Sequence, residues 1–246
     1  MLSTKIYDTV ILGSGYFSLG YALTHENTLI IEDTQLVDPH FFGALQGFCG
    51  NAQRPVSKGA SALYDAFLGD GVIKGNRLAV NELEPAICRF IAGKNLNILL
   101  GTFCTDLKFN GEAYEIEICN NEGLSVVKAK RVIDIRLDGG NRMNLLVAVK
   151  DGKIPNITGV APAFYDDQII VELTFRENED INRAKLEMLE LEDKLSEVGA
   201  RIVCASYRMF GDKHFEPYTD EMGVLHVDET AEGGIFEAYE KGEMWK

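Results

Sequence analysis

The start of the chain carries an apolar segment, a glycine turn, a helical segment and a second apolar segment in immediate succession. Residues Ile6–Leu12 (IYDTVIL) and Thr28–Ile31 (TLII) are β-branched and apolar, which is typical of buried strands. Between them lie the turn at residues 13–15 and the segment Tyr16–Thr24, whose apolar side chains recur at helical spacing. This order predicts a parallel β-α-β unit and therefore an α/β fold.

The turn has the spacing of a dinucleotide-binding fingerprint. Gly13 permits a tight turn, and Gly15 lets a pyrophosphate approach the backbone N–H groups at the helix N-terminus, where the helix dipole favours anions. The third position needs a small residue for close helix–strand packing, and Ser18 stands there. Glu32 ends the second strand, 32 − 13 = 19 residues after Gly13, and is placed to accept hydrogen bonds from ribose hydroxyls. These four residues and Ser14 are the candidate cofactor contacts of the turn.

The rest of the chain predicts helices, a meander and a small α+β second region. Residues 33–58 have no clear period and predict a long irregular loop, followed by helices at residues 59–68 and 82–92. Strands are predicted at residues 97–101, 103–109, 114–119, 124–129 and 131–135. Beyond Gly140, strands are predicted at residues 143–150, 168–175 and 201–206, and helices at residues 180–198 and 235–241.

The charge of the chain is acidic and unevenly distributed. The 246 residues carry a formal charge of 24 − 38 = −14, so we expect no nucleic-acid partner, because phosphate binding needs Lys and Arg. Residues 166–246 alone carry 9 basic and 21 acidic side chains, a net charge of 9 − 21 = −12. This surplus favours a solvated acidic face, with a docking site for a protein partner as the alternative.

The cysteines and the apolar segments point to a reducing, aqueous compartment. Five cysteines occur without a C-x-x-C pair, which indicates reduced thiols rather than a disulfide framework or a zinc site, and the four histidines are isolated in sequence. No run has transmembrane length, and glycines interrupt the apolar stretch at residues 10–23, so we expect neither a membrane span nor a signal peptide. The expected location is cytoplasmic.

A later segment supports a family resemblance. Residues 98–140 read ILLGTFCTDLKFNGEAYEIEICNNEGLSVVKAKRVIDIRLDGG. Together with the turn and Glu32, this segment resembles the FAD-dependent oxidoreductases of the two-dinucleotide-binding type, near the fumarate-reductase-like group. The resemblance implies FAD as the cofactor. It also implies a Rossmann-like FAD-binding domain with a β-meander, formed by residues 1–140 and 212–246, and a small α+β substrate or cap region at residues 141–211.

The same resemblance assigns three further contacts. The backbone at Cys104 takes the position that meets the adenine ring, and Gly43 falls where the family keeps glycine near the flavin. Glu229 stands at the acidic position of the step that precedes the last, glycine-led helix. No catalytic acid or base can be singled out.

Three function hypotheses follow. The first is an FAD-binding oxidoreductase acting on a small molecule, in which the flavin carries the hydride chemistry. The second is a flavoprotein-like fold without redox activity that binds a nucleotide or a partner; a short first helix and the absence of an Ala-Thr-Gly step at residues 135–137 favour it. The third, an NAD-dependent dehydrogenase or a methyltransferase, is disfavoured by the meander, since those sheets continue with βα units.

Overall fold

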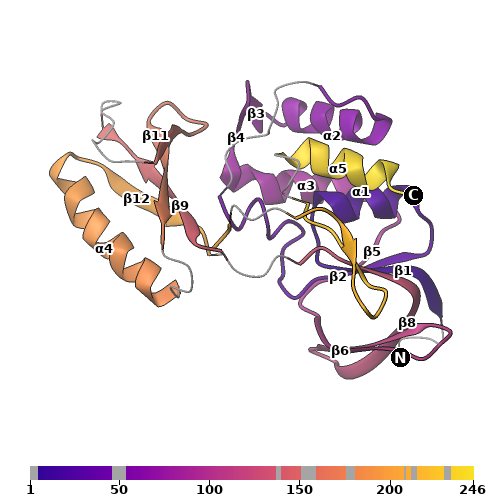
Figure 1. The fold of residues 1–246 in the computed structure, drawn as a ribbon. Coiled ribbons are helices and arrows are strands. Elements are labelled where there is room, and N and C mark those ends of the chain that lie inside the picture. The colour runs from indigo at the N-terminus through magenta and orange to yellow at the C-terminus, as the bar shows by residue number, and fades with distance from the viewer. Residues whose placement is uncertain are drawn as a thin grey trace.

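The computed structural model describes residues 5–45, 54–136, 140–150, 159–175, 181–207, 209–211, 215–229 and 234–246 (Figure 1). Its centre is a parallel sheet formed by β5 (Asn97–Leu99), β2 (Thr28–Ile31), β1 (Ile6–Leu12) and the carboxyl-terminal part of β8 (Gly123–Asp134). Ile11 of β1 is in register with Ile30 of β2 on one side and with Ile133 of β8 on the other. The predicted β-α-β unit and α/β fold class are confirmed.

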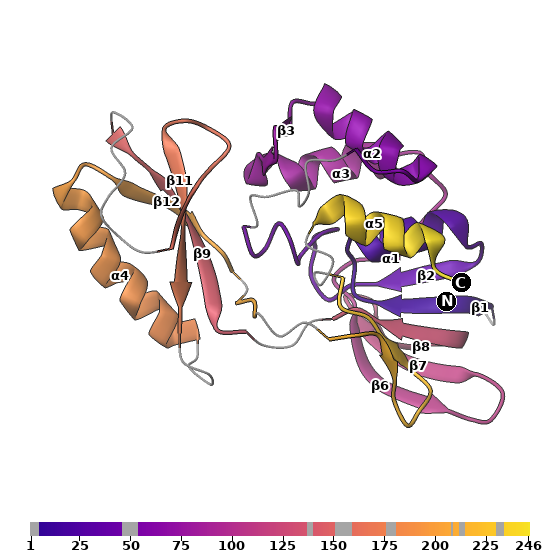
Figure 2. The ribbon, with the colours of Figure 1, turned by 45° about the horizontal axis from the view of Figure 1, so that its top comes forward.

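The two faces of this sheet are covered by different elements because side chains alternate along a strand. Ile11, Ile30 and Ile133 face a helical layer and belong to the largest apolar cluster. Val10 and Leu12 face the meander, which consists of β6 (Phe103–Phe109), β7 (Tyr114–Asn120) and the first half of β8. Figure 2 shows the helices on one side of the sheet and the meander beyond its other side. A sheet buried on both faces explains the continuous apolar runs in its strands.

The helical layer contains α1 (Tyr16–Thr24), α2 (Lys58–Gly69), α3 (Leu83–Ile91) and α5 (Ile235–Met244). Helix α5 lies beside α1 in both views although the two are at opposite ends of the chain (Figures 1 and 2). Glycines make this approach possible: a Cβ at Gly20 would overlap the Tyr239 carbonyl oxygen, and a Cβ at Gly242 would overlap the Phe17 carbonyl oxygen. Gly20, which interrupts the apolar stretch in sequence, is therefore a packing residue of α1.

The predicted strands at residues 124–129 and 131–135 are one element, and the two-strand prediction was wrong. Strand β8 is continuous over 12 residues. Its first half pairs antiparallel with β7 and its second half pairs parallel with β1. One strand therefore connects the meander to the parallel sheet, and alternating polar residues hide that continuity in the sequence.

Several short elements were not predicted, because runs of two or three residues carry no period. They are β3 (Ile73–Lys74), β4 (Arg77–Leu78), a 3-10 helix (Val80–Glu82), β10 (Val160–Pro162), β13 (Tyr218–Thr219) and β14 (Leu225–His226). Strand β14 extends the parallel sheet, with Leu225 in register with Ile133 of β8. The last part of the chain thus returns to the first sheet.

A second, four-stranded antiparallel sheet has the order β10-β11-β9-β12, with β9 at Arg142–Ala148, β11 at Gln168–Thr174 and β12 at Arg201–Ala205. Helix α4 (Ile181–Glu197) packs its Ala184, Leu191 and Leu195 side chains against this sheet. The side-chain amide of Asn144 in β9 donates to the Ala44 carbonyl oxygen at 3.0 Å, which joins the second sheet to the loop after β2. The exact domain boundaries stay a prediction.

Candidate functional site

The turn between β1 and α1 has a conformation that requires glycine at its first position. Gly13 has φ +100°, and a Cβ there would also lie 2.7 Å from the Ile135 side chain. The Gly13 N–H donates to the Ile31 carbonyl oxygen at 2.8 Å, so the turn is tied to the end of β2. Ser14 is fully buried, and its hydroxyl donates to the Val37 carbonyl oxygen at 2.6 Å. The turn is therefore a rigid part of the core.

Ser18 has a role beyond being small. Its hydroxyl accepts a hydrogen bond from the Gly15 N–H at 2.9 Å and donates one to the Gly15 carbonyl oxygen, also at 2.9 Å. These bonds satisfy a backbone donor at the start of α1, where the first N–H groups of a helix lack partners inside the helix. A glycine at this position could not supply them.

Glu32 lies beside the turn, as its position at the end of β2 predicts. Its side chain is buried, and its two carboxylate oxygens accept hydrogen bonds from the Ser14 N–H and the Thr34 N–H, each at 2.8 Å. Burial raises the pKa of Glu32 above its ordinary value. The carboxylate thus holds the turn and the loop after β2 together.

Glu229 reaches the N-terminus of α1 from the far end of the chain. It is fully buried, and its Oε2 accepts a hydrogen bond from the Phe17 N–H at 3.0 Å. Its Oε1 contacts Nδ1 of His40, which is also buried. A Cβ at Gly15 would overlap this carboxylate. Gly15 therefore leaves room for an anion over the helix N-terminus, and in this structure that anion is the carboxylate of Glu229.

A second buried carboxylate, Asp38, lies close to this anion. Asp38 accepts hydrogen bonds from the Phe41 N–H at 3.0 Å and the Phe42 N–H at 3.3 Å. Burial and the neighbouring Glu229 carboxylate raise the pKa of Asp38 to about 7. The Glu84 carboxylate in turn accepts a hydrogen bond from the Asp38 N–H at 3.2 Å. The sequence analysis did not select Asp38 or His40 as candidate site residues. The signal that could have indicated them is the long irregular loop at residues 33–58, which contains both.

Tyr16, the first residue of α1, belongs to the same cluster. Its ring is fully buried, and its hydroxyl makes no hydrogen bond of normal geometry to the described residues. Burial, together with the nearby Asp38 carboxylate, raises its pKa well above the ordinary value. The N-terminus of α1 thus presents backbone donors, a phenol and an imidazole among the carboxyl groups of Glu32, Asp38, Glu84 and Glu229.

Two candidate residues lie in other surroundings. Gly43 packs against Tyr207: a Cβ there would overlap the Pro39 carbonyl oxygen and come close to the Tyr207 ring. The Tyr207 N–H also donates to the Gly43 carbonyl oxygen at 3.2 Å, so Gly43 contributes to the contact with the second region. Cys104 lies half-buried in β6, and burial raises the pKa of its thiol. Their assignment to the flavin and the adenine stays a prediction.

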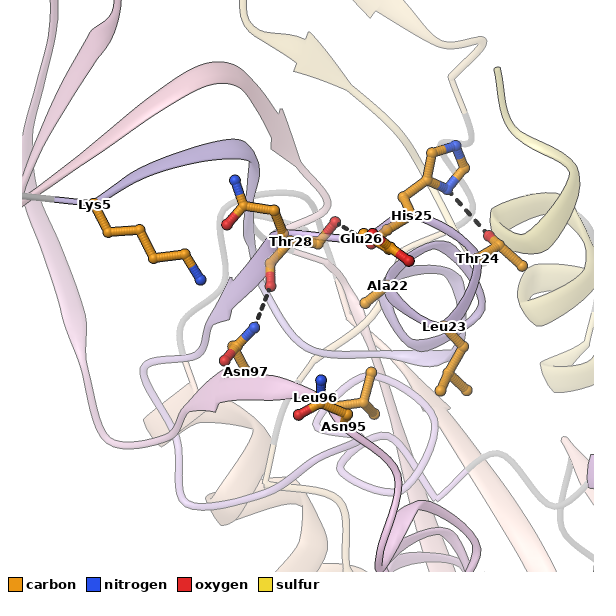
Figure 3. Close-up of a pocket in the computed structure, with 11 residues that line it drawn as sticks. Lys5, Ala22, Leu23, Thr24, His25, Glu26, Thr28, Asn95, Leu96 and Asn97 are labelled. Atoms are coloured by element: carbon orange, nitrogen blue, oxygen red, sulfur yellow. Dashed lines mark hydrogen bonds between the residues drawn. The ribbon is translucent and has the colours of Figure 1, made fainter.

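A polar cavity of about 790 Å³ lies at the opposite end of the sheet, at the amino ends of β2 and β5 (Figure 3). Thr28, Asn97, His25 and Lys5 are among its lining residues, and the Asn97 side-chain amide donates to the Thr28 carbonyl oxygen at 3.1 Å. None of the residues assigned to the cofactor lines this cavity. In open α/β sheets, ligands bind outside the carboxyl ends of the strands, so the turn remains the candidate site.

The described part of the chain also bears on thiol chemistry, metal binding and membrane spans. Cys88, Cys104, Cys119 and Cys204 are free thiols, and Cys49 lies outside the described residues. Among the described residues, no three His, Cys, Asp or Glu side chains are grouped as a metal site. Within that same part of the chain, no helix has the length and apolar character that crossing a membrane requires.

Comparison with known proteins establishes the fold. No protein-family model matches the chain, and no curated protein matches it. Among solved structures, it is similar to the p-nitrophenol 4-monooxygenase PnpA from Pseudomonas putida DLL-E4, with 13% identity, a TM-score of 0.62, and coverage of 97% of this chain and 78% of PnpA. It is also similar to the anhydrotetracycline hydroxylase OxyS from Streptomyces rimosus, with 15% identity, a TM-score of 0.63, and coverage of 97% and 60%.

A third similar structure is CabE, an aromatic hydroxylase from angucycline biosynthesis, with 13% identity, a TM-score of 0.57, and coverage of 97% of this chain and 60% of CabE. The chain therefore spans about three fifths of the length of CabE and of OxyS. At such identities the likeness concerns the fold, and it supports the predicted α/β architecture over nearly the whole chain.

Proposed function

We propose that this protein is an FAD-binding oxidoreductase that acts on a small molecule. The observation that carries the proposal is the anion held over Gly15 at the N-terminus of α1, directly after a parallel strand and beside Glu32. The carboxyl group of Glu229 at this position supports the proposal, because a helix N-terminus favours an anionic group such as the diphosphate of a dinucleotide. The hydroxylases and the monooxygenase of similar fold support a redox function, as does a flavoprotein/dehydrogenase from Cytophaga hutchinsonii, with 14% identity and a TM-score of 0.52.

The residues of the turn fit this cofactor once Glu229 leaves the helix N-terminus. The Phe17 N–H and its neighbours would bind the diphosphate, and the Glu32 carboxylate would accept hydrogen bonds from the ribose hydroxyls. The backbone at Cys104 would meet the adenine ring, and Gly43 would lie toward the flavin. When bound, FAD supplies the electron transfer, while the protein orients the cofactor and excludes water.

For the substrate we propose a small molecule, and for the protein we propose the broad class of FAD-dependent oxidoreductases. The sequence resembles the fumarate-reductase-like group, whereas PnpA, OxyS and CabE are a monooxygenase and hydroxylases. The second sheet, β10-β11-β9-β12, joins the loop after β2 through Asn144 and Tyr207. We propose that this region covers the substrate.

The test is the visible absorption spectrum of the purified protein, before and after incubation with FAD and desalting. We expect flavin bands that stay with the protein at about one FAD per chain. The matched control is Gly15→Val, because its side chain would fill the space over the helix N-terminus. Equal flavin retention by the folded control would show that the turn is not the binding site, and its residues would lose their assigned roles.

A second candidate is a protein of this fold without redox activity, and Glu229 at the helix N-terminus favours it. In that case the turn serves to anchor the C-terminal segment, and the acidic region after Tyr165 would bind a protein partner. A folded protein that retains no flavin at saturating FAD would support this alternative over the first.

A further inference from the structure

The position that binds the diphosphate in the proposed function is filled by a side chain of the protein itself. The Glu229 carboxylate accepts the Phe17 N–H hydrogen bond and lies in the space that the missing side chain of Gly15 leaves. We propose that Glu229, instead of contacting the cofactor as the resemblance implies, is an internal competitor of the cofactor diphosphate, so that a dinucleotide binds only when this carboxylate withdraws. The inference rests on the proposed function, because it takes a dinucleotide as the ligand.

Steric exclusion is the first argument. Even a single carbon atom at Gly15 would overlap both oxygens of the Glu229 carboxylate, so this group lies in contact with the backbone of the turn. A phosphate that approaches the same backbone needs the same volume. The Phe17 N–H has one proton to donate, and the carboxylate already accepts it at 3.0 Å.

Charge is the second argument. Glu229 is fully buried and lies close to the carboxyl group of Asp38, with the His40 imidazole in contact with its Oε1. A diphosphate brings two further negative charges into this cluster, and repulsion between buried like charges is weakly screened. Withdrawal of Glu229 takes its carboxyl group away from the helix N-terminus and from His40, so that both can contact the phosphate.

The chain anchors the backbone near Glu229, so only a short part of it has to move. Leu225 and His226 pair with β8, and the Val227 N–H donates to the Asp134 carbonyl oxygen at 3.0 Å. The backbone two residues before Glu229 is therefore held by the sheet. We infer that the side chain of Glu229 is the moving group.

The chain contains a matched control for this role. Glu243 caps α2 in the same manner: its carboxylate accepts hydrogen bonds from the Gly59 N–H at 3.0 Å, the Ala60 N–H at 3.2 Å and the Ser57 hydroxyl at 2.6 Å. Helix α2 is not the helix that begins directly after the glycine turn at residues 13–15, so its N-terminus is not the proposed dinucleotide site. Loss of the Glu243 cap should therefore lower stability without changing the affinity for a dinucleotide.

The experiment measures the binding of FAD and of ADP to four proteins by isothermal titration calorimetry: the wild type, Glu229→Ala, Glu229→Gln and Glu243→Gln. ADP carries the diphosphate without a flavin. Thermal unfolding confirms that each variant folds, and Glu229→Gln keeps the shape of the side chain if Glu229→Ala does not fold. We expect Glu229→Ala to bind both ligands about tenfold or more tightly than the wild type, the scale of one charge-assisted hydrogen bond, and Glu243→Gln to bind as the wild type does.

The outcomes separate this inference from the proposed function. Tighter binding of FAD and of ADP by Glu229→Ala supports the competitor role of Glu229 and the FAD function alike. Tighter binding of ADP without any binding of FAD supports the competitor role and rejects the FAD function. Equal FAD affinity in all four proteins upholds the FAD function and overturns the competitor role, and an absence of binding in every folded variant overturns both.

Discussion

The carboxylate of Glu229 and the backbone N–H of Phe17 are joined by a hydrogen bond of 3.0 Å across 212 residues of sequence. Glu243 and Glu240 make similar bonds at the start of α2, with the backbone N–H groups of Gly59 and Val56 at 3.0 Å each. Three acidic residues of the C-terminal segment thus satisfy donors at helix N-termini. The acidic surplus after Tyr165 is therefore not only a solvated face, because part of it holds this segment to the helical layer that contains α1 and α2.

Gly15 is expected to be required mainly because of Glu229. Its backbone is extended, with φ −174°, so any residue can adopt the conformation, and only space limits a side chain. Gly15→Ala should lower the free energy of unfolding by about 1–3 kcal/mol, the usual cost of overpacking. Chemical denaturation of Gly15→Ala, Glu229→Ala and the double variant measures the coupling of the two sites.

In the double variant, Gly15→Ala should lower the free energy of unfolding much less than it does in the wild type, because the Glu229 carboxylate that its Cβ would overlap is absent. Additive losses would instead show that Gly15 is needed for a reason unrelated to Glu229.

Glu32→Ala should destabilise the protein even without a cofactor. The substitution removes the acceptors of the Ser14 and Thr34 N–H groups and leaves buried donors without a protein partner. We expect a loss of about 1–3 kcal/mol in the free energy of unfolding, and a weaker affinity for FAD and ADP by a similar amount. Glu32→Gln, which retains one acceptor oxygen, is the control for the loss of stability.

If Glu32→Ala lowers stability but leaves nucleotide affinity unchanged, Glu32 is a structural acceptor only, and its assignment to the ribose fails.

The contact between α1 and α5 should tolerate no larger residue at its two glycines. Gly20→Ala and Gly242→Ala each place a carbon atom against a backbone carbonyl oxygen of the other helix. Each should cost about 1–3 kcal/mol of stability because backbone cannot move aside as a flexible side chain does. Gly69→Ala is the matched control, since a Cβ at Gly69 meets nothing within 4 Å. Urea denaturation of the three variants checks this, and similar stabilities would refute the close packing of these helices.

Stability should fall as the pH rises through about 7. The pKa of Asp38 is raised to about 7 in the folded protein, above the value of about 3.9 in an unfolded chain, so the folded state binds the proton more tightly. Protonated Asp38 therefore stabilises the fold at low pH, and this contribution is lost as the pH rises through the folded-state pKa. Denaturation at about pH 6 and about pH 8.5 should show a smaller pH dependence for Asp38→Asn than for the wild type.

Parallel pH dependences of the two proteins would mean that Asp38 does not titrate in this range.

Local patterns were sufficient for the elements that build the site. The strand–turn–helix–strand order, the glycine at Gly13 and the acidic residue at Glu32 follow from residues adjacent in sequence, and the structure places them together. Strand β8 shows the limit of such patterns, because its two halves pair with different partners and its continuity depends on both. The neighbours of Gly43 were equally unpredictable, since Tyr207 belongs to a different sheet region.

The sequence by itself determined a parallel β-α-β unit with a turn that can hold an anion at the start of its helix. These features depend on backbone conformation and on the alternation of apolar residues, which neighbouring residues control. Only the tertiary structure decided which anion lies there. A helix N-terminus leaves N–H groups without partners, and any buried acceptor that the fold brings near can satisfy them. In this chain it is Glu229, placed by the pairing of β14 with β8 and held in contact with His40.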